Sequence, residues 1–208
     1  FANADINVVT SIKPVHSLVS GVMEGVATPD LIIDTGGSPH TYSLKPSQAR
    51  QLQNADIVFW ISPKLEAFLE KPIESIATNA LVLQLLETEG LLKVNFREGG
   101  AFDSHEHEHD KQDEHDEHDE HDEQDEHDEH DEHHADETDP HIWLDPLNAA
   151  ILVSHIADAL SDSDPDNKQT YEANAGVILA KLDQLVDDVT KELKPVQDRG
   201  YIVFHDAY

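Results

Sequence analysis

Ten histidines of this chain gather in one stretch, residues 103–138, where they alternate with aspartate and glutamate. From residue 115 to residue 133 the order His-Asp-Glu repeats, with Gln124 in place of one histidine. Imidazole nitrogen and carboxylate oxygen are side-chain ligands that Zn²⁺ and related divalent ions bind. We therefore predict weak metal binding at many positions of this His-rich tract, carried by His105, His107, His109, His115, His118, His121, His127, His130, His133 and His134.

The His-rich tract is too acidic and too poor in apolar residues to form a packed core. Up to Asp139 it contains 21 acids and Lys111 as its only base, so it carries most of the formal net charge of −31. Such a composition cannot bury enough surface to offset the entropy of ordering the chain, and we expect disorder. A specific metal site needs ligands held by rigid elements, so we expect this tract to gather metal rather than to form that site.

Three histidines outside the tract share one context. His40, His141 and His205 each lie at or just beyond the end of an expected strand or the start of an expected helix. A single histidine in a loop is usually an ordinary polar residue, so each position alone is a weak indication of a metal site.

Other polar and aromatic residues have simpler interpretations. We expect His16 to pack in a loop or a first helical turn rather than to bind metal, and His155 to face solvent from the middle of a helix. Trp60 and Trp143 are expected in the core or in the wall of a cleft. Asp145 is expected to cap a helix, and its carboxylate could also accept a hydrogen bond from a histidine that binds metal.

The order of elements before the tract predicts the fold class. Apolar, β-branched runs predict strands and helical spacing predicts the helices between them, in the order strand 6–10, helix 15–26, strand 31–33, helix from about 46 or 47, strand 56–61, helix 64–76 and strand 81–85. This alternation predicts an α/β fold, with a parallel sheet flanked by helices on both faces. Ligands of such sheets bind beyond the carboxyl ends of the strands, where we expect His40 and His141.

After the tract the sequence predicts two helices and one more strand. Asp145-Pro146 is a helix start, with aspartate as the cap and proline in the first turn. Apolar residues at intervals of three and four predict a long helix at 167–193, which at about 1.5 Å per residue would cross the whole molecule. Pro195 and Gly200 end it, and residues 201–204 predict a strand.

These elements divide the chain into successive parts. We expect an amino-terminal α/β lobe at 1–102 and 139–165, the disordered His-rich loop at 103–138, a linking helix at 166–195, and the first strand of a carboxy-terminal lobe at 200–208. A strand cannot stand alone in water. Either the last strand joins the first sheet or the sequence is the front part of a longer protein, and we favour the second interpretation.

Composition excludes several classes of function. The chain has no cysteine, which rules out disulfides and thiolate metal ligands. An acidic surface disfavours nucleic acid, because phosphate binding needs a basic one. No apolar run approaches the roughly 20 residues of a membrane span, so we expect no direct membrane insertion. The small residues among positions 1–5 are typical of signal-peptide cleavage sites and predict a processed, secreted protein.

Four stretches of sequence together resemble the metal-binding solute-binding proteins of ABC importers, in particular the zinc-specific periplasmic branch, the ZnuA type. They are Thr10-Ser11-Ile12-Lys13-Pro14, Gly37-Ser38-Pro39-His40-Thr41-Tyr42-Ser43-Leu44-Lys45-Pro46-Ser47, Asp139-Pro140-His141-Ile142-Trp143-Leu144-Asp145-Pro146 and Phe204-His205-Asp206-Ala207-Tyr208. The resemblance covers the whole chain except the His-rich tract.

The resemblance implies two α/β lobes joined by one long helix, with Zn²⁺ held in the cleft between them. The family's ligand positions fall on His40 and His141 in the first lobe and on His205 in the second. Some zinc-binding relatives have glutamate just before the first histidine, where this chain has Pro39, so the fourth ligand stays open and we expect water. The implied protein captures Zn²⁺ in the periplasm as a monomer and delivers it to an inner-membrane ABC permease, with the tract as collector, buffer or sensor.

Three alternatives remain at this point. Manganese-binding relatives usually carry a carboxylate at the position of His205, so histidine favours zinc. A metal-storage or chaperone protein would use the tract alone and would not need the three separate histidines. A zinc hydrolase would also use three histidines and water, but the sequence has no His-Glu-x-x-His or Gly-x-Ser-x-Gly pattern.

Overall fold

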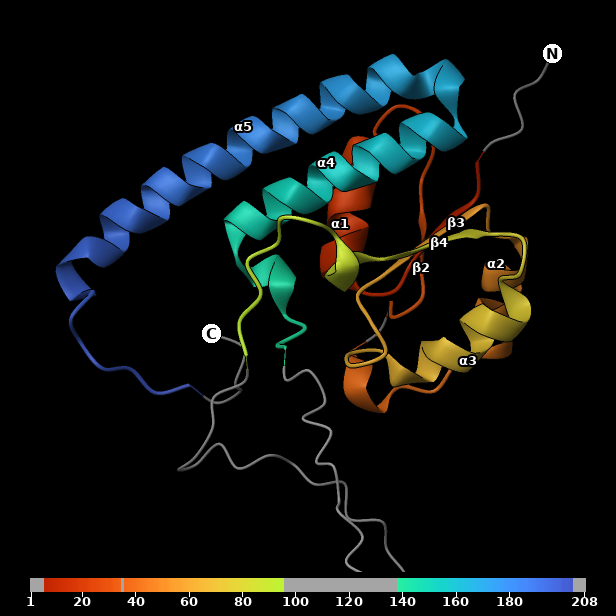
Figure 1. Cartoon of the computed structure of the whole chain (residues 1–208), viewed down its shortest axis with the longest axis horizontal. Coiled ribbons are helices and arrows are strands. Elements are labelled where there is room, and N and C mark those ends of the chain that lie inside the picture. The colour runs from red at the N-terminus through yellow and green to blue at the C-terminus, as the bar shows by residue number, and fades with distance from the viewer. Residues whose placement is uncertain (1–5, 35, 96–137, 204–208) are drawn as a thin grey trace, which may run out of the picture.

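The computed structural model describes residues 6–34, 36–95 and 138–203. Within these residues, four parallel strands form one sheet: β1 (Val8–Thr10), β2 (Asp30–Leu31), β3 (Ile57–Trp60) and β4 (Leu81–Gln84), in the order β2-β1-β3-β4. β1 and β3 are central and fully buried, which explains why all their residues except Thr10 are apolar. The predicted α/β fold with a parallel sheet is confirmed (Figure 1).

Helices flank the sheet, as expected (Figure 1). They are α1 (Lys13–Val22), α2 (Pro46–Asn54), α3 (Ala67–Ile76), α4 (Pro146–Ser163) and α5 (Lys168–Leu193). Prolines in the first turns of α1, α2 and α4 set the helix starts, because the missing N–H is not needed there. α3 begins three residues later than predicted, since Glu66 turns its side chain back to the backbone N–H groups of Ile61 and Ser62.

The core contains buried residues of all five helices, and the α4–α5 hairpin is tied to the rest of the lobe by polar contacts as well. Tyr171 of α5 is fully buried, and its hydroxyl donates to Oδ2 of Asp164 at 2.7 Å. Asn174 of α5 donates to the carbonyl oxygens of Val22 and Glu24 at 2.9 and 2.8 Å. These two carbonyls lie at the carboxyl end of α1, so α5 satisfies acceptors that a helix end leaves open.

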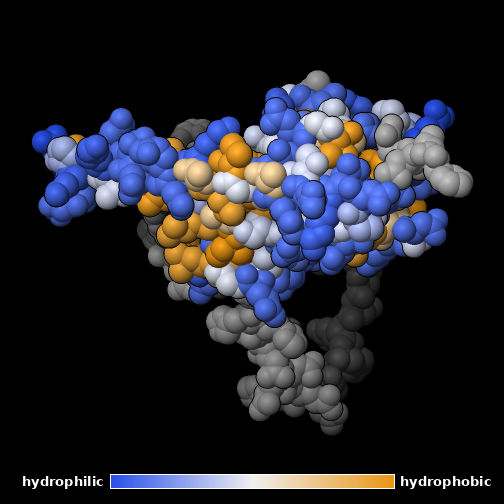
Figure 2. Space-filling view, turned by 90° about the horizontal axis from the view of Figure 1, so that it is seen from above, coloured by the Kyte–Doolittle hydropathy of each residue, from blue (hydrophilic) through white to orange (hydrophobic). Residues whose placement is uncertain are grey.

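The long helix is half embedded and half exposed. Its amino-terminal half packs on α1 and α4, whereas Leu185, Val189 and Leu193 are 41–55% exposed although they continue the same apolar spacing. Figure 1 shows this end of α5 reaching past the sheet, and Figure 2 shows apolar side chains gathered where the helix leaves the body of the lobe. The apolar face of α5 therefore contacts this lobe only in the first half of the helix.

The end of the described chain differs from the expected strand. Tyr201, Ile202 and Val203 have no regular secondary structure, and Ile202 is fully exposed. A strand needs a neighbouring strand for its hydrogen bonds, and none pairs with these residues in the part of the chain that the structure describes. Phe204, His205, the tract at 103–137 and residues 1–5 lie outside the described residues.

Candidate metal site

His40 lies in the connection between β2 and α2. It is in a short 3₁₀ helix, Pro39–Thr41, which Pro39 can start because proline has its φ angle already fixed. Ser38 caps this turn, with its Oγ accepting from the backbone N–H of His40 at 3.4 Å. The backbone of His40 is therefore held in a capped 3₁₀ turn.

His141 lies just before the 3₁₀ helix Ile142–Leu144 that leads into α4. Oδ1 of Asp139 accepts from the backbone N–H of His141 at 2.9 Å and lies 2.6 Å from Nδ1 of its ring. Both side chains are largely buried. An ionised carboxylate only accepts, so Nδ1 carries the hydrogen and Nε2 is the nitrogen that can present a lone pair to a metal.

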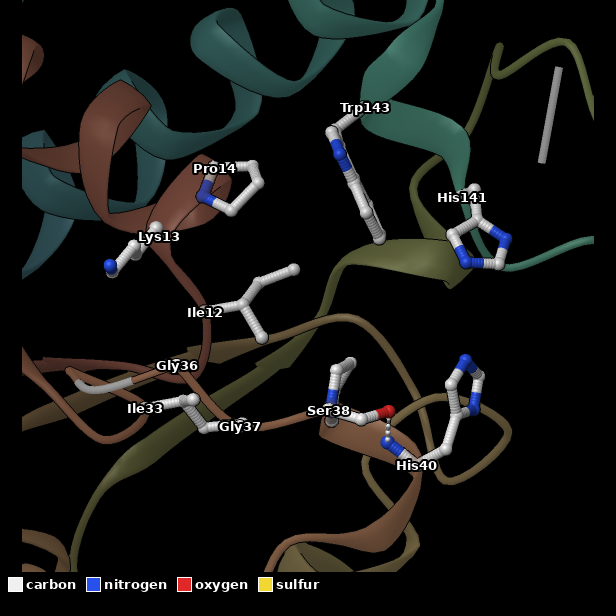
Figure 3. A pocket seen from close by; sticks show the side chains of 11 residues that line it. Ile12, Lys13, Pro14, Ile33, Gly36, Gly37, Ser38, His40, His141 and Trp143 are labelled. Atoms are coloured by element: carbon white, nitrogen blue, oxygen red, sulfur yellow. Dashed lines mark hydrogen bonds between the residues drawn. The ribbon is translucent and has the colours of Figure 1, made fainter. Parts of the chain in front are cut away.

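The two imidazoles meet at one pocket. Their ring centroids are 6.0 Å apart, with an angle of 57° between the planes, and the ring of Trp143 lies 5.3 Å from that of His141. The pocket measures about 460 Å³ and is bounded by Ile12, Lys13 and Pro14 on the side of α1. Figure 3 shows the two histidine rings one above the other on the same side of this pocket.

Two nitrogen ligands do not complete a zinc site. Zn²⁺ in proteins usually has four ligands, and the residues that the structure describes contain no group of three His, Cys, Asp or Glu side chains placed to hold a metal. The predicted third ligand, His205, lies outside the described residues. The structure thus brings together His40 and His141 as a pair and leaves His205 as a prediction.

The carboxylate that contacts a candidate ligand is Asp139, which the sequence reasoning missed. Asp145 caps α4, as predicted, with its Oδ1 accepting from the backbone N–H of Leu147 at 2.8 Å. The contact with a ligand histidine that was also considered for Asp145 is made by Asp139 instead. Asp139 precedes His141 by two residues, with Pro140 between them. An aspartate side chain often accepts a hydrogen bond from the backbone N–H two residues later, which forms an Asx-turn. The Asp-Pro-His spacing could therefore have indicated the contact between Asp139 and His141.

The other two histidines that the structure describes, His16 and His155, lie on helices outside the pocket. His16 is in the first turn of α1, where Nε2 donates to the carbonyl oxygen of Pro29 at 3.1 Å and Ser20 Oγ lies 3.3 Å from Nδ1. Both ring nitrogens are therefore engaged, as expected for a packing residue. His155 is half-buried rather than turned to solvent, because the face of α4 that carries it borders a hollow beside β4.

The tryptophans divide between core and cleft. Trp60 is 5% exposed at the end of β3, whereas Trp143 is half-buried and lines the pocket beside His141. Each therefore takes one of the two roles expected from the sequence.

A buried carboxylate contacts Ser11, the residue just before the pocket-lining residue Ile12. Glu66 is fully buried and accepts from Ser11 Oγ at 2.5 Å and from the backbone N–H groups of Ile61 and Ser62. Burial raises the pKa of Glu66 to about 7, although the three hydrogen bonds act in the opposite direction. Glu66 thus joins the ends of β1 and β3 next to the segment that forms the pocket wall.

Comparison with known proteins shows the family. The family model described as ZnuA, zinc-uptake complex component A, periplasmic, matches residues 8–208. The chain belongs to this family. The resemblance stated from the sequence is thereby confirmed, and the ZnuA match extends across the His-rich tract to the end of the chain.

Individual ZnuA-like proteins agree with this assignment. The high-affinity zinc uptake system protein ZnuA of Brucella abortus is 50% identical over 207 residues, which are 97% of this chain and 62% of that protein. The chain therefore spans about three-fifths of the length of this relative. The structure of the Zn(II)-bound ZnuA-like domain of Streptococcus pneumoniae AdcA shares the fold, with a TM-score of 0.70 and 23% identity over 98% of this chain and 61% of that one.

A structure with a different metal shares the fold as well. The Mn-bound periplasmic metal binding protein of candidatus liberibacter asiaticus has a TM-score of 0.62 and 18% identity over 93% of this chain and 56% of that one. Likeness of fold therefore does not choose between zinc and manganese. In the described part of this chain, no helix is long and apolar enough to span a membrane.

Proposed function

We propose that this protein is the solute-binding component of an ABC-type zinc importer, which captures Zn²⁺ in the periplasm and delivers it to an inner-membrane permease. It is a binding protein, not an enzyme, and no bond is made or broken. The observation that carries the proposal is the pair of imidazoles, His40 and His141, whose rings lie 6.0 Å apart at one pocket. Family membership and the zinc-uptake names of its relatives support the same cargo.

Zinc is favoured over manganese by the donor atoms. The two histidines supply nitrogen, which suits a borderline ion, whereas Mn²⁺ prefers sites rich in carboxylate. The nearby carboxylate of Asp139 is engaged with the N–H and the ring of His141. We propose His205 as the third ligand and water as the fourth, with the His-rich tract as an accessory that collects, buffers or senses zinc.

A competition titration with chelators of graded affinity tests this function. Wild type should hold one tight, zinc-selective ion in addition to weak ones, and His40→Ala, His141→Ala and His205→Ala should each abolish the tight one. His155→Ala is a matched control, because His155 lies on α4 away from the pocket. Tight binding that survives the first three changes would contradict the proposal and favour a storage protein that uses only the tract.

A further inference from the structure

One buried amide ties together the connection that carries His40. Gln48 of α2 is 5% exposed. Its Nε2 donates to the carbonyl oxygen of Ile32 at 2.5 Å and to the hydroxyl of Tyr42 at 2.8 Å. Its Oε1 accepts from the backbone N–H of Lys45 at 2.8 Å.

These contacts are spread along the whole connection between β2 and α2. Ile32 is where the connection begins, Lys45 is where it ends, and Tyr42 lies between them, two residues after His40. The two hydrogens on Nε2 and a lone pair of Oε1 are all used. Only an amide offers two donors and an acceptor at this size, and a leucine of similar volume would leave three polar groups without this partner.

Tyr42 carries the restraint to a second helix. Its ring lies 5.1 Å from that of Phe68 of α3, measured between centroids, in a tilted arrangement. The hydroxyl of Tyr42 is thus held by α2 and its ring by α3. Because a 3₁₀ turn connects Tyr42 directly to His40, the position of the histidine backbone follows from these two contacts.

We propose that Gln48 and Tyr42 are positioning residues for zinc binding, holding His40 at the separation from His141 that the metal requires. The inference rests on the function proposed above. If the connection that carries His40 were not held in place, the metal would have to order it on binding. The entropy cost of that ordering would reduce the affinity for the metal. Neither Gln48 nor Tyr42 touches the metal in this account.

Two variants with matched controls test this role in the full protein. Tyr42→Phe removes one hydroxyl and keeps the ring on Phe68, while Gln48→Leu removes the amide. Tyr171→Phe also removes a tyrosine hydroxyl, but in the α4–α5 hairpin, and Gln53→Leu changes an exposed glutamine of the same helix α2. We expect Tyr42→Phe and Gln48→Leu to weaken tight Zn²⁺ binding by about 10-fold or more, as when a residue that supports a ligand is lost.

The readouts separate positioning from general stability. Zn²⁺ affinity, the visible absorption of bound Co²⁺ and the melting temperature are measured for all four variants. Tyr42→Phe should alter both the affinity and the Co²⁺ spectrum, whereas Tyr171→Phe should lower only the melting temperature. Affinity and spectrum unchanged in Tyr42→Phe would overturn the inference. In that case His40→Ala tells the two proposals apart. If His40→Ala keeps the tight site, the proposed function is wrong, and if His40→Ala loses the tight site, only the positioning role of Tyr42 and Gln48 is wrong.

Discussion

The carboxylate of Asp139 holds His141 at two points, 2.9 Å from the backbone nitrogen and 2.6 Å from Nδ1 of the ring. This contact involves Nδ1 of the ring, and Nε2 is the nitrogen that we propose as the metal ligand. It also places a negative charge beside an imidazole that would donate to a cation, which strengthens the ligand.

Replacing Asp139 should therefore weaken zinc binding without unfolding the lobe. We expect Asp139→Ala to lower Zn²⁺ affinity by about 10- to 100-fold. Asp145→Ala provides the comparison, because it removes the cap of α4 and should cost about 1 kcal/mol of stability instead. Chelator competition and chemical denaturation of both variants measure the two effects. Equal zinc affinity in the two variants would refute the role of Asp139.

Glu66 should make stability depend on pH. Because burial raises its folded-state pKa from 4.5 to about 7, the stabilisation from the protonated form is complete below pH 4.5 and is lost as pH rises to about 7. The expected loss is on the order of 3 kcal/mol. Glu66→Gln cannot ionise, so its free energy of unfolding should rise relative to wild type across this range. The free energy of unfolding of both proteins is measured by denaturant titration at several pH values. If the two curves run parallel, ionisation of Glu66 does not contribute to the pH dependence of stability.

Asn174 should matter for stability and not for metal. It is the donor to the carbonyl oxygens of Val22 and Glu24, and Asn174→Ala leaves both without that donor. We expect a loss of about 1–3 kcal/mol, measured by urea denaturation. Zinc affinity should equal that of wild type within experimental error. Asn174 contacts the carboxyl end of α1, whereas the pocket is bordered by the opposite, amino-terminal end of that helix. A large fall in affinity would mean that the packing of α5 on α1 also controls the site.

The two residues that flank the segment containing the His-rich tract lie side by side, so the tract can be replaced by a short turn. Asn95 and Thr138 form an antiparallel bridge, and the backbone N–H of Asp139 donates to Val94 O at 2.8 Å. Replacing residues 96–137 by Asn-Gly, a favoured two-residue turn, should keep this bridge and hence His141. Zinc titration should then show one tight ion and no weak ones. Loss of the tight site would assign the tract a direct part in it.

Much of the sheet was predictable because its strands are short apolar runs. Residues 56–61 and 81–85 contain β3 and β4, and the α4 start at Pro146 follows the predicted cap. What the sequence could not show is which surfaces stay uncovered, because that depends on distant partners. The helix Lys168–Leu193 was predicted at 167–193, but the exposure of its second half, which this lobe does not cover, was not. Tyr201 begins a predicted strand that has no neighbour within the described residues.

The two candidate ligands could be predicted from the sequence, but the residues that hold them in place could not. His40 and His141 follow strands at opposite edges of the sheet, β2 and β4, so their 6.0 Å separation depends on how the connections cross the sheet end. Gln48 lies within a helix and Glu66 just before one, where sequence gives no indication that a polar side chain is buried. Most of their partners are backbone groups, which every residue has, and their side-chain partners, Tyr42 and Ser11, are not marked by any residue pattern.

The most direct test is a crystal structure of the full protein with one equivalent of Zn²⁺. The account predicts a single ion bonded to the imidazoles of His40 and His141, with Nε2 of His141 at about 2.0–2.1 Å and Nδ1 still on Asp139. Zinc bound without His40 or without His141, or bound by Nδ1 of His141, would contradict it.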